Sequence, residues 1–153
     1  MNQGVGTIDP QFDQAGSGHS GRPDRPTNGP WLTGVHGGNR HDNPYATFGK
    51  TTDFRRIGSS DVFFMVDENP WSINDGALAV DAGSPRWIDY PASGHNNACG
   101  FSFCDGHAEI HRWRTTQLQI NKPPPHDASQ AVQGGLMDPD WTWLVQHSTT
   151  KVQ

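Results

Sequence analysis

Runs of apolar residues along the chain predict a few short strands. Residues 62–66 form a continuous apolar run bounded by charge, as in a buried strand. Residues 76–80 and 86–90 predict shorter strands, and 101–104 with 107–113 predict a hairpin. Residues 138–146 begin Asp-Pro-Asp and predict a short C-terminal helix with an acidic first turn. The pattern predicts an α+β, mostly β fold: an antiparallel sheet with long loops and little helix.

Asp105-Gly106, between alternating residues, is the strongest local signal. This pair favours a two-residue type I′ turn, because both central positions need positive φ. Such a turn would pair Cys104 with His107 and Phe101 with Ile110. One face of the hairpin would then carry Phe101, Phe103, Ala108 and Ile110, and the other Ser102, Cys104, His107, Glu109 and His111.

Composition favours a small aromatic core under long loops. Hydrophobic residues make up 32% of the 153 residues, but the net charge of -5 is modest, and six Trp and seven Phe supply large buried areas. The 18 Gly and 12 Pro indicate extensive loops. A mildly acidic chain with no run of Lys or Arg argues against nucleic acid or an anionic membrane surface as a partner.

The organisation along the chain is simple. Residues 1–30 are rich in Gly, Ser and Pro and predict an extended or mobile N-terminal arm, and residues 31–153 predict one domain. The first twenty residues contain neither the roughly 20-residue apolar run of a membrane span nor a signal peptide. Taken as complete, the sequence would therefore predict a cytoplasmic protein without a membrane span.

A family resemblance lies in residues 94–113, where His95, nine further residues and Asp105-Gly106 resemble the H-X9-DG signature of pseudopilin-like proteins. These are the type II secretion G-like or prepilin-type proteins, and the signature marks their C-terminal domain. Further matching segments are 60–68, 72–76, 89–93 and 140–144, so the resemblance runs from about Trp31 to Thr150. It implies a pilin-like globular head that acts outside the cytoplasm, in secretion or a cell-surface assembly with protein partners. The family's leader and long apolar helix have no counterpart in this chain.

The loop at residues 67–76 is a candidate calcium site. Asp67, Glu68, Asn74 and Asp75 offer the carboxylate and amide oxygens that calcium prefers. The spacing is not that of an EF-hand. The resemblance adds weight, because major pseudopilins hold calcium in a loop of the sheet region. The alternative is an Asx-type turn in which Asn74 and Asp75 cap backbone amides.

His107, Glu109 and His111 are a second candidate metal set, because two His and a carboxylate on one strand face could hold zinc with an open position. On a regular strand, His107 and His111 would lie roughly 13 Å apart, too far to share one ion. Zinc is therefore disfavoured. A solvated strand face with cross-strand pairs, such as Ser102 with Glu109, is the favoured interpretation.

The signature residues favour a structural role. We expect His95 to reach the Asp105 turn and to fix the strand between them, while Gly106 supplies the positive φ. The alternative is a catalytic role for His95 and Asp105. Cys99 and Cys104 have opposite parity on one strand, which predicts two free thiols. A Cys104–His107 catalytic pair is the competing interpretation of the second thiol.

Three classes of function follow. The first is a soluble pseudopilin-like head stabilised by calcium. The second is a calcium-dependent hydrolase of small esters or lactones, in which Asp67, Glu68 or Asp75 holds the ion and His95 or His107 moves the proton. The third is a carbohydrate-binding module, whose stacking platforms would be Trp31, Trp71, Trp87 and Trp113.

Overall fold

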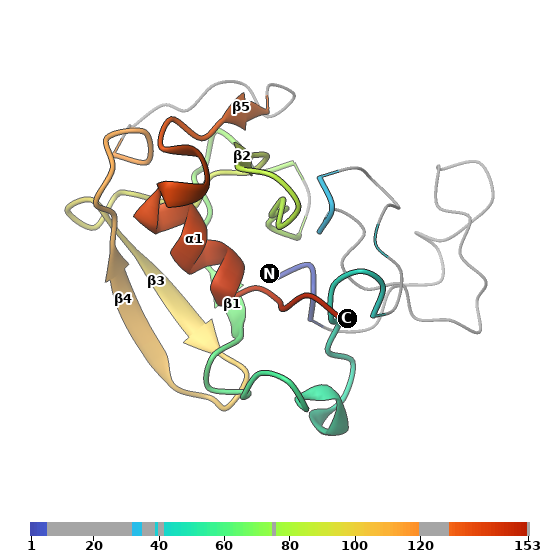
Figure 1. Ribbon diagram of the computed structural model, residues 1–153. Coiled ribbons are helices and arrows are strands. Elements are labelled where there is room, and N and C mark those ends of the chain that lie inside the picture. Colours follow the sequence, from blue (N-terminus) through green and yellow to red (C-terminus); the bar gives the residue numbers. More distant parts are fainter. Residues whose placement is uncertain (6–31, 35–38, 40–41, 75, 120–128, 153) are drawn as a thin grey trace.

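The computed structural model describes residues 1–5, 32–34, 39, 42–74, 76–119 and 129–152 (Figure 1). This part of the chain is mostly sheet, with one α-helix, as the sequence predicts. The strands are β1 (Phe63–Val66), β2 (Arg86–Trp87), β3 (Ala98–Phe103), β4 (Ala108–Arg112) and β5 (Gln130–Ala131). The helices are the 3-10 turns η1 (Thr51–Asp53) and η2 (Gly135–Met137) and the α-helix α1 (Pro139–Gln146).

Two antiparallel sheets organise the molecule. The larger has the order β1-β3-β4, and the smaller pairs β2 with β5. The run at 62–66 becomes β1, as predicted, with an irregularity between Phe63 and Met65. The predicted strand at 76–80 is wrong: that segment makes only isolated bridges, from Leu78 to Asn2 and from Val80 to Trp87.

The hairpin forms where predicted, but its turn differs. Phe103 N–H donates to His107 O over 2.8 Å, and Gly106 N–H donates to Phe103 O over 3.0 Å. The loop therefore has three residues, 104–106, and only Gly106 has positive φ, at 98°. This is the geometry of a turn closed by a glycine bulge, not the predicted type I′ turn. The extra loop residue shifts the register by one, so Phe101 pairs with Glu109 instead of Ile110.

The shift exchanges the two faces of β4. A one-residue slip moves every side chain to the opposite side of the sheet. His107, Glu109 and His111 consequently share the face of Phe101 and Phe103, and Ile110 lies on the outer face with 74% of its surface exposed. The predicted division of the hairpin into an apolar and a polar face is therefore wrong. Aromatic packing accommodates the histidines, because His107 stacks on Phe103 and His111 stacks on Trp143 of α1.

Helix α1 covers the inner side of the sheet (Figure 1). Asp138 caps it by accepting hydrogen bonds from Asp140 N and Trp141 N, and Pro139 starts the helix, as the Asp-Pro-Asp sequence predicts. Trp141 and Leu144 join the main core cluster. The other members of that cluster are Phe63, Leu78, Val80, Trp87, Tyr90, Cys99, Phe101, Phe103, Trp113, Leu118 and Val132.

The first residues of the chain are packed into the domain. Asn2 is fully buried, and its side-chain amide donates to Phe63 O and Ser148 O. The remainder of the predicted arm, residues 6–30, lies outside the described residues. Within the part that the structure describes, no helix has the length and apolar character needed to cross a membrane.

Candidate functional sites around the β3–β4 hairpin

The loop that follows β1 holds the predicted calcium ligands. Asp67 Oδ2 lies 3.8 Å from His95 Nε2, and both side chains are more than half exposed. Glu68 Oε1 instead accepts from the Ser72 hydroxyl over 3.0 Å. Asn74 is exposed, and Asp75 lies outside the described residues.

These contacts do not build a calcium cage from the described residues. Asp67 and Glu68 have different partners, and nowhere in the described ranges do three or more His, Cys, Asp or Glu side chains group so that they could hold a metal ion. An Asx-type turn does form, but on Asn69, whose Oδ1 accepts from Trp71 N over 3.1 Å. Asp67 and Glu68 therefore do not converge on one point, and with Asp75 outside the described residues the calcium site stays a prediction.

His95 and Asp105 stand at opposite ends of β3. Strand β3 has six extended residues, so its two ends lie roughly 20 Å apart. His95 sits in the turn before β3, where Asn96 and Asn97 adopt positive φ, and it faces Asp67. The predicted contact between His95 and the Asp105 turn is therefore wrong. The nine residues between His95 and Asp105 consist mainly of β3 and the turn that precedes it.

Asp105 and His107 form a local contact across the hairpin loop. Asp105 Oδ1 lies 2.6 Å from His107 Nδ1 and also accepts from His107 N over 3.1 Å. These hydrogen bonds from the His107 backbone and ring lower the pKa of Asp105, which is an exposed carboxyl. The arrangement holds the loop closed and turns the His107 ring onto Phe103.

Neither cysteine is placed for nucleophilic chemistry. Both are free, as predicted. Burial, aided by the charge of Asp105, raises the pKa of Cys104 to about 11, and burial, aided by Asp67, raises the pKa of Cys99 to about 12. A thiol with such a pKa is almost fully protonated near neutrality and is a poor nucleophile. Cys104 packs against a second apolar cluster of Ala46, Phe48 and Val62.

Sequence reasoning missed one buried carboxylate that holds several donors. Asp140, fully buried at the start of α1, accepts from Arg114 N, Thr115 N and the Thr115 hydroxyl over 2.7–3.0 Å. Burial alone would raise the pKa of Asp140, but the His111 imidazole and the bonds from Thr115 and Arg114 lower it. The Asp-Pro-Asp sequence predicted an acidic helix start, but not that the second Asp would hold the segment after β4.

His111 lies beside this carboxylate. Its Nε2 is 3.9 Å from Asp140 Oδ1, beyond hydrogen-bonding distance, and has no hydrogen-bond partner among the described residues. Its ring stacks on Trp143 with centroids 3.7 Å apart and planes 20° apart. The imidazole therefore fills the space between β4 and α1 as an aromatic group.

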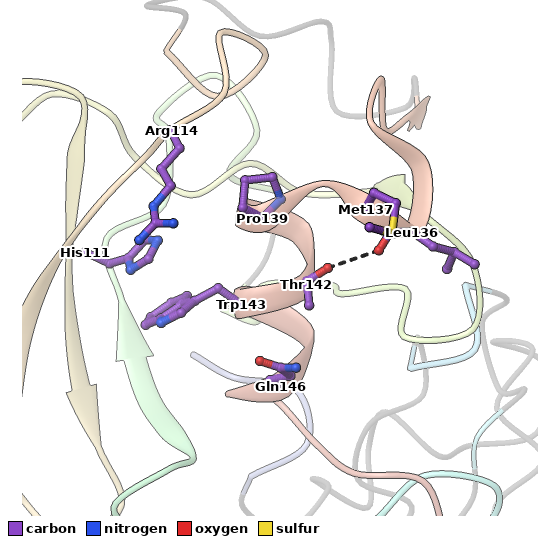
Figure 2. A pocket seen from close by; sticks show the side chains of 8 residues that line it. All are labelled: His111, Arg114, Leu136, Met137, Pro139, Thr142, Trp143 and Gln146. Atoms are coloured by element: carbon purple, nitrogen blue, oxygen red, sulfur yellow. Dashed lines mark hydrogen bonds between the residues drawn. The ribbon is translucent and has the colours of Figure 1, made fainter.

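A shallow hollow of about 400 Å³ opens above this stack. Figure 2 shows Arg114, His111 and Trp143 on one side of α1, and Leu136 and Met137 on the other. Pro139, Thr142 and Gln146 complete the lining. Asp140 is fully buried and is not part of the lining. The hollow is lined by a cation, two stacked rings and apolar side chains.

Two of the four predicted carbohydrate platforms are buried. Trp87 and Trp113 are core residues whose ring N–H groups donate to Gln117 Oε1 and Ala92 O. Their predicted role as stacking platforms is therefore wrong. Trp71 is 56% exposed, and Trp31 lies outside the described residues.

Comparisons of the chain with family models, with curated proteins and with solved structures gave no match. The fold and these contacts define the class of the protein. That class is a small antiparallel α+β domain in which His95 faces Asp67 at one end of β3 and Asp105 contacts His107 at the other.

Proposed function

We propose that this chain is the globular head of a pseudopilin-like protein, with a non-catalytic role in a secretion or cell-surface assembly outside the cytoplasm. The observation that carries the proposal is the place of the H-X9-DG segment. It provides β3, the middle strand of the larger sheet, together with the turns at both ends of that strand. A signature that specifies a central strand and its turns is a signature of a scaffold.

The polar residues of the segment also favour this role over hydrolysis. His95 contacts Asp67 at one end of β3, and His107 contacts Asp105 at the other. A general base and a nucleophile must lie within hydrogen-bonding reach of each other or of one substrate atom. The candidate catalytic residues His95, His107 and Asp105 do not meet this condition together, and the described calcium ligands do not converge.

The exposed apolar residues supply contact surface for partners. Trp71 and Ile73 lie in the loop after β1, and Leu136 and Met137 lie beside α1, each more than half exposed. We propose that these two pairs of exposed apolar side chains are points of contact with other proteins. Calcium has no part in this proposal.

The test has two arms. Purified protein is incubated with a panel of ester and lactone substrates, with calcium or with EDTA, and we expect no turnover above buffer. In cells that encode the protein, a photo-crosslinking residue at Met137 should capture pilin-type proteins, and the same residue at Thr51, an exposed residue of η1, is the control. Turnover that disappears in His107→Gln, or capture equal at the two positions, would overturn the proposal.

A further inference from the structure

Among the residues that the structure describes, β4 pairs only with β3, so its other side has no partner there. The bonds Phe103 N–His107 O and Trp113 N–Asn97 O show that the odd-numbered residues along β4 direct their backbone groups toward β3. Because this direction alternates along an antiparallel strand, Ala108, Ile110 and Arg112 direct theirs away from β3. No described residue bonds them on that side. We call these backbone groups of residues 108–112 the β4 edge, and in Figure 1 it borders the sheet.

The β4 edge lacks most of the features that discourage pairing. Edge strands are usually blunted by Pro, by bulges, by Lys or by a covering segment. Residues 108–112 read Ala-Glu-Ile-His-Arg and pair with β3 in an unbroken register. Ile110 adds an apolar side chain that is 74% exposed at the centre of the strand. The exceptions are two charged side chains, Glu109 on the face that α1 covers and Arg112 at the end of the strand.

We infer that the β4 edge binds the β4 edge of a second copy of this chain, antiparallel and about a twofold axis at Ile110. In this register Ile110 exchanges both backbone bonds with its counterpart, and Ala108 does so with Arg112. All six outward N–H and C=O groups of the strand find partners. The two sheets become one continuous six-stranded sheet.

Avoidance of like charges and contact between the Ile110 side chains favour this register over its neighbours. Centring the pair on Ile110 sets Glu109 of one copy opposite His111 of the other, so the two acidic side chains do not face each other. Centring it on Glu109 would set two acidic side chains face to face, which is destabilising. Centring it on His111 would place the His111 side chains of the two copies opposite each other, although each stacks on Trp143 of its own chain. It would also leave Ala108 outside the strand pairing. Only the Ile110 register also brings the two exposed Ile side chains together.

The inference goes beyond the proposed function, because it names a surface and its partner. Pairing through the β4 edge needs no other protein and no activity. A failure of either proposal is therefore distinguishable from a failure of the other: turnover assays decide the first, and the mass of the purified protein decides the second.

The first test measures mass by sedimentation equilibrium over a series of protein concentrations. We expect the full chain to form a concentration-dependent dimer and Ile110→Pro to remain a monomer. The N–H of Ile110 faces away from β3, so proline removes an intermolecular donor but no bond within the sheet, and edge strands tolerate it there. Met65→Lys is the control, since Met65 is also exposed but lies on β1. A circular dichroism melt confirms that each variant is folded.

The second test fixes the register. Paired residues that exchange both backbone bonds have Cα atoms about 5.5 Å apart, within the range that a disulfide spans. Ile110→Cys should therefore form a covalent dimer on mild oxidation, and Met65→Cys should not. The natural thiols interfere little, because burial raises the pKa of both. A chain that is monomeric at every concentration overturns the inference. A dimer that survives Ile110→Pro, with no bridge in Ile110→Cys, also overturns it.

Discussion

Two aspartates that lie close to a histidine behave differently in this molecule. At the hairpin loop, Asp105 contacts His107 at 2.6 Å in an exposed turn. At the start of α1, Asp140 lies 3.9 Å from His111, fully buried, and binds the amides of Arg114 and Thr115. The first carboxylate lies in the recognisable motif, and the second carries the long-range contacts. Proximity of an acid to an imidazole therefore says little until burial and the other partners are known.

The difference lies in what each carboxylate connects. Asp105 bonds a residue two positions away, which orders a turn that water could also solvate. Asp140 bonds residues 25 and 26 positions away, so it joins α1 to the segment after β4. Removing a partner from buried donors costs more than removing one from exposed donors, since the buried groups cannot turn to water.

The largest predicted effect tests this comparison directly. Asp140→Ala leaves the Arg114 and Thr115 amides and the Thr115 hydroxyl without their acceptor, and we expect it to lower the free energy of unfolding by about 3–5 kcal/mol. Asp105→Ala is the matched control and should have a much smaller effect. Urea denaturation followed by Trp fluorescence measures both. Equal losses in the two variants would show that burial does not separate the two sites.

A second prediction uses the pH dependence of the same carboxylate. The pKa of Asp140 is lowered in the folded state, so its ionised form contributes stability that is present above the unfolded-state pKa of about 4 and is lost as pH falls through the folded-state pKa. Asp140→Asn cannot titrate. The stability difference between the natural chain and this variant should therefore shrink on acidification below about pH 4. Urea titrations at stepped pH measure it, and a difference that grows would contradict the sign.

The sequence predicts features that depend on local contacts better than features that depend on long-range contacts. The helix at 139–146 and strand β1 were predictable, because capping residues and apolar runs act locally. The hairpin was predicted, but Asp105-Gly106 is also compatible with a three-residue loop, and this choice reversed the faces of β4. The partners of Asp140 were not predictable, because they lie about 25 residues away and follow from packing. The sequence predicts a contact of His95 with the Asp105 turn, but the actual neighbour, Asp67, lies 28 positions away and follows from packing in the same way.

A third prediction concerns the hairpin loop, where we expect a smaller loss in the free energy of unfolding. Gly106 has a φ of 98°, so Gly106→Ala forces a Cβ into a strained conformation and should lower the free energy of unfolding by about 1 kcal/mol or more. Gly94→Ala is the control, because an added Cβ there meets no atom within 4 Å and its φ is not in the positive region. Thermal melts of the two variants compare them. An unchanged melting temperature in Gly106→Ala would contradict the loop assignment.

The smallest predicted effect is the change of melting temperature with calcium. It tests whether the family resemblance extends to calcium binding by the loop at residues 67–76. An ion that binds the folded state raises stability by about 1.4 kcal/mol for each tenfold excess over its dissociation constant. Because Asp67 faces His95 and Glu68 holds Ser72, we expect melting temperatures to be the same in calcium and in EDTA. Asp67→Asn should not alter this comparison. A rise with calcium that Asp67→Asn abolishes would show that the loop at 67–76 rearranges around the ion, and the resemblance to calcium-binding pseudopilins would then extend to this loop.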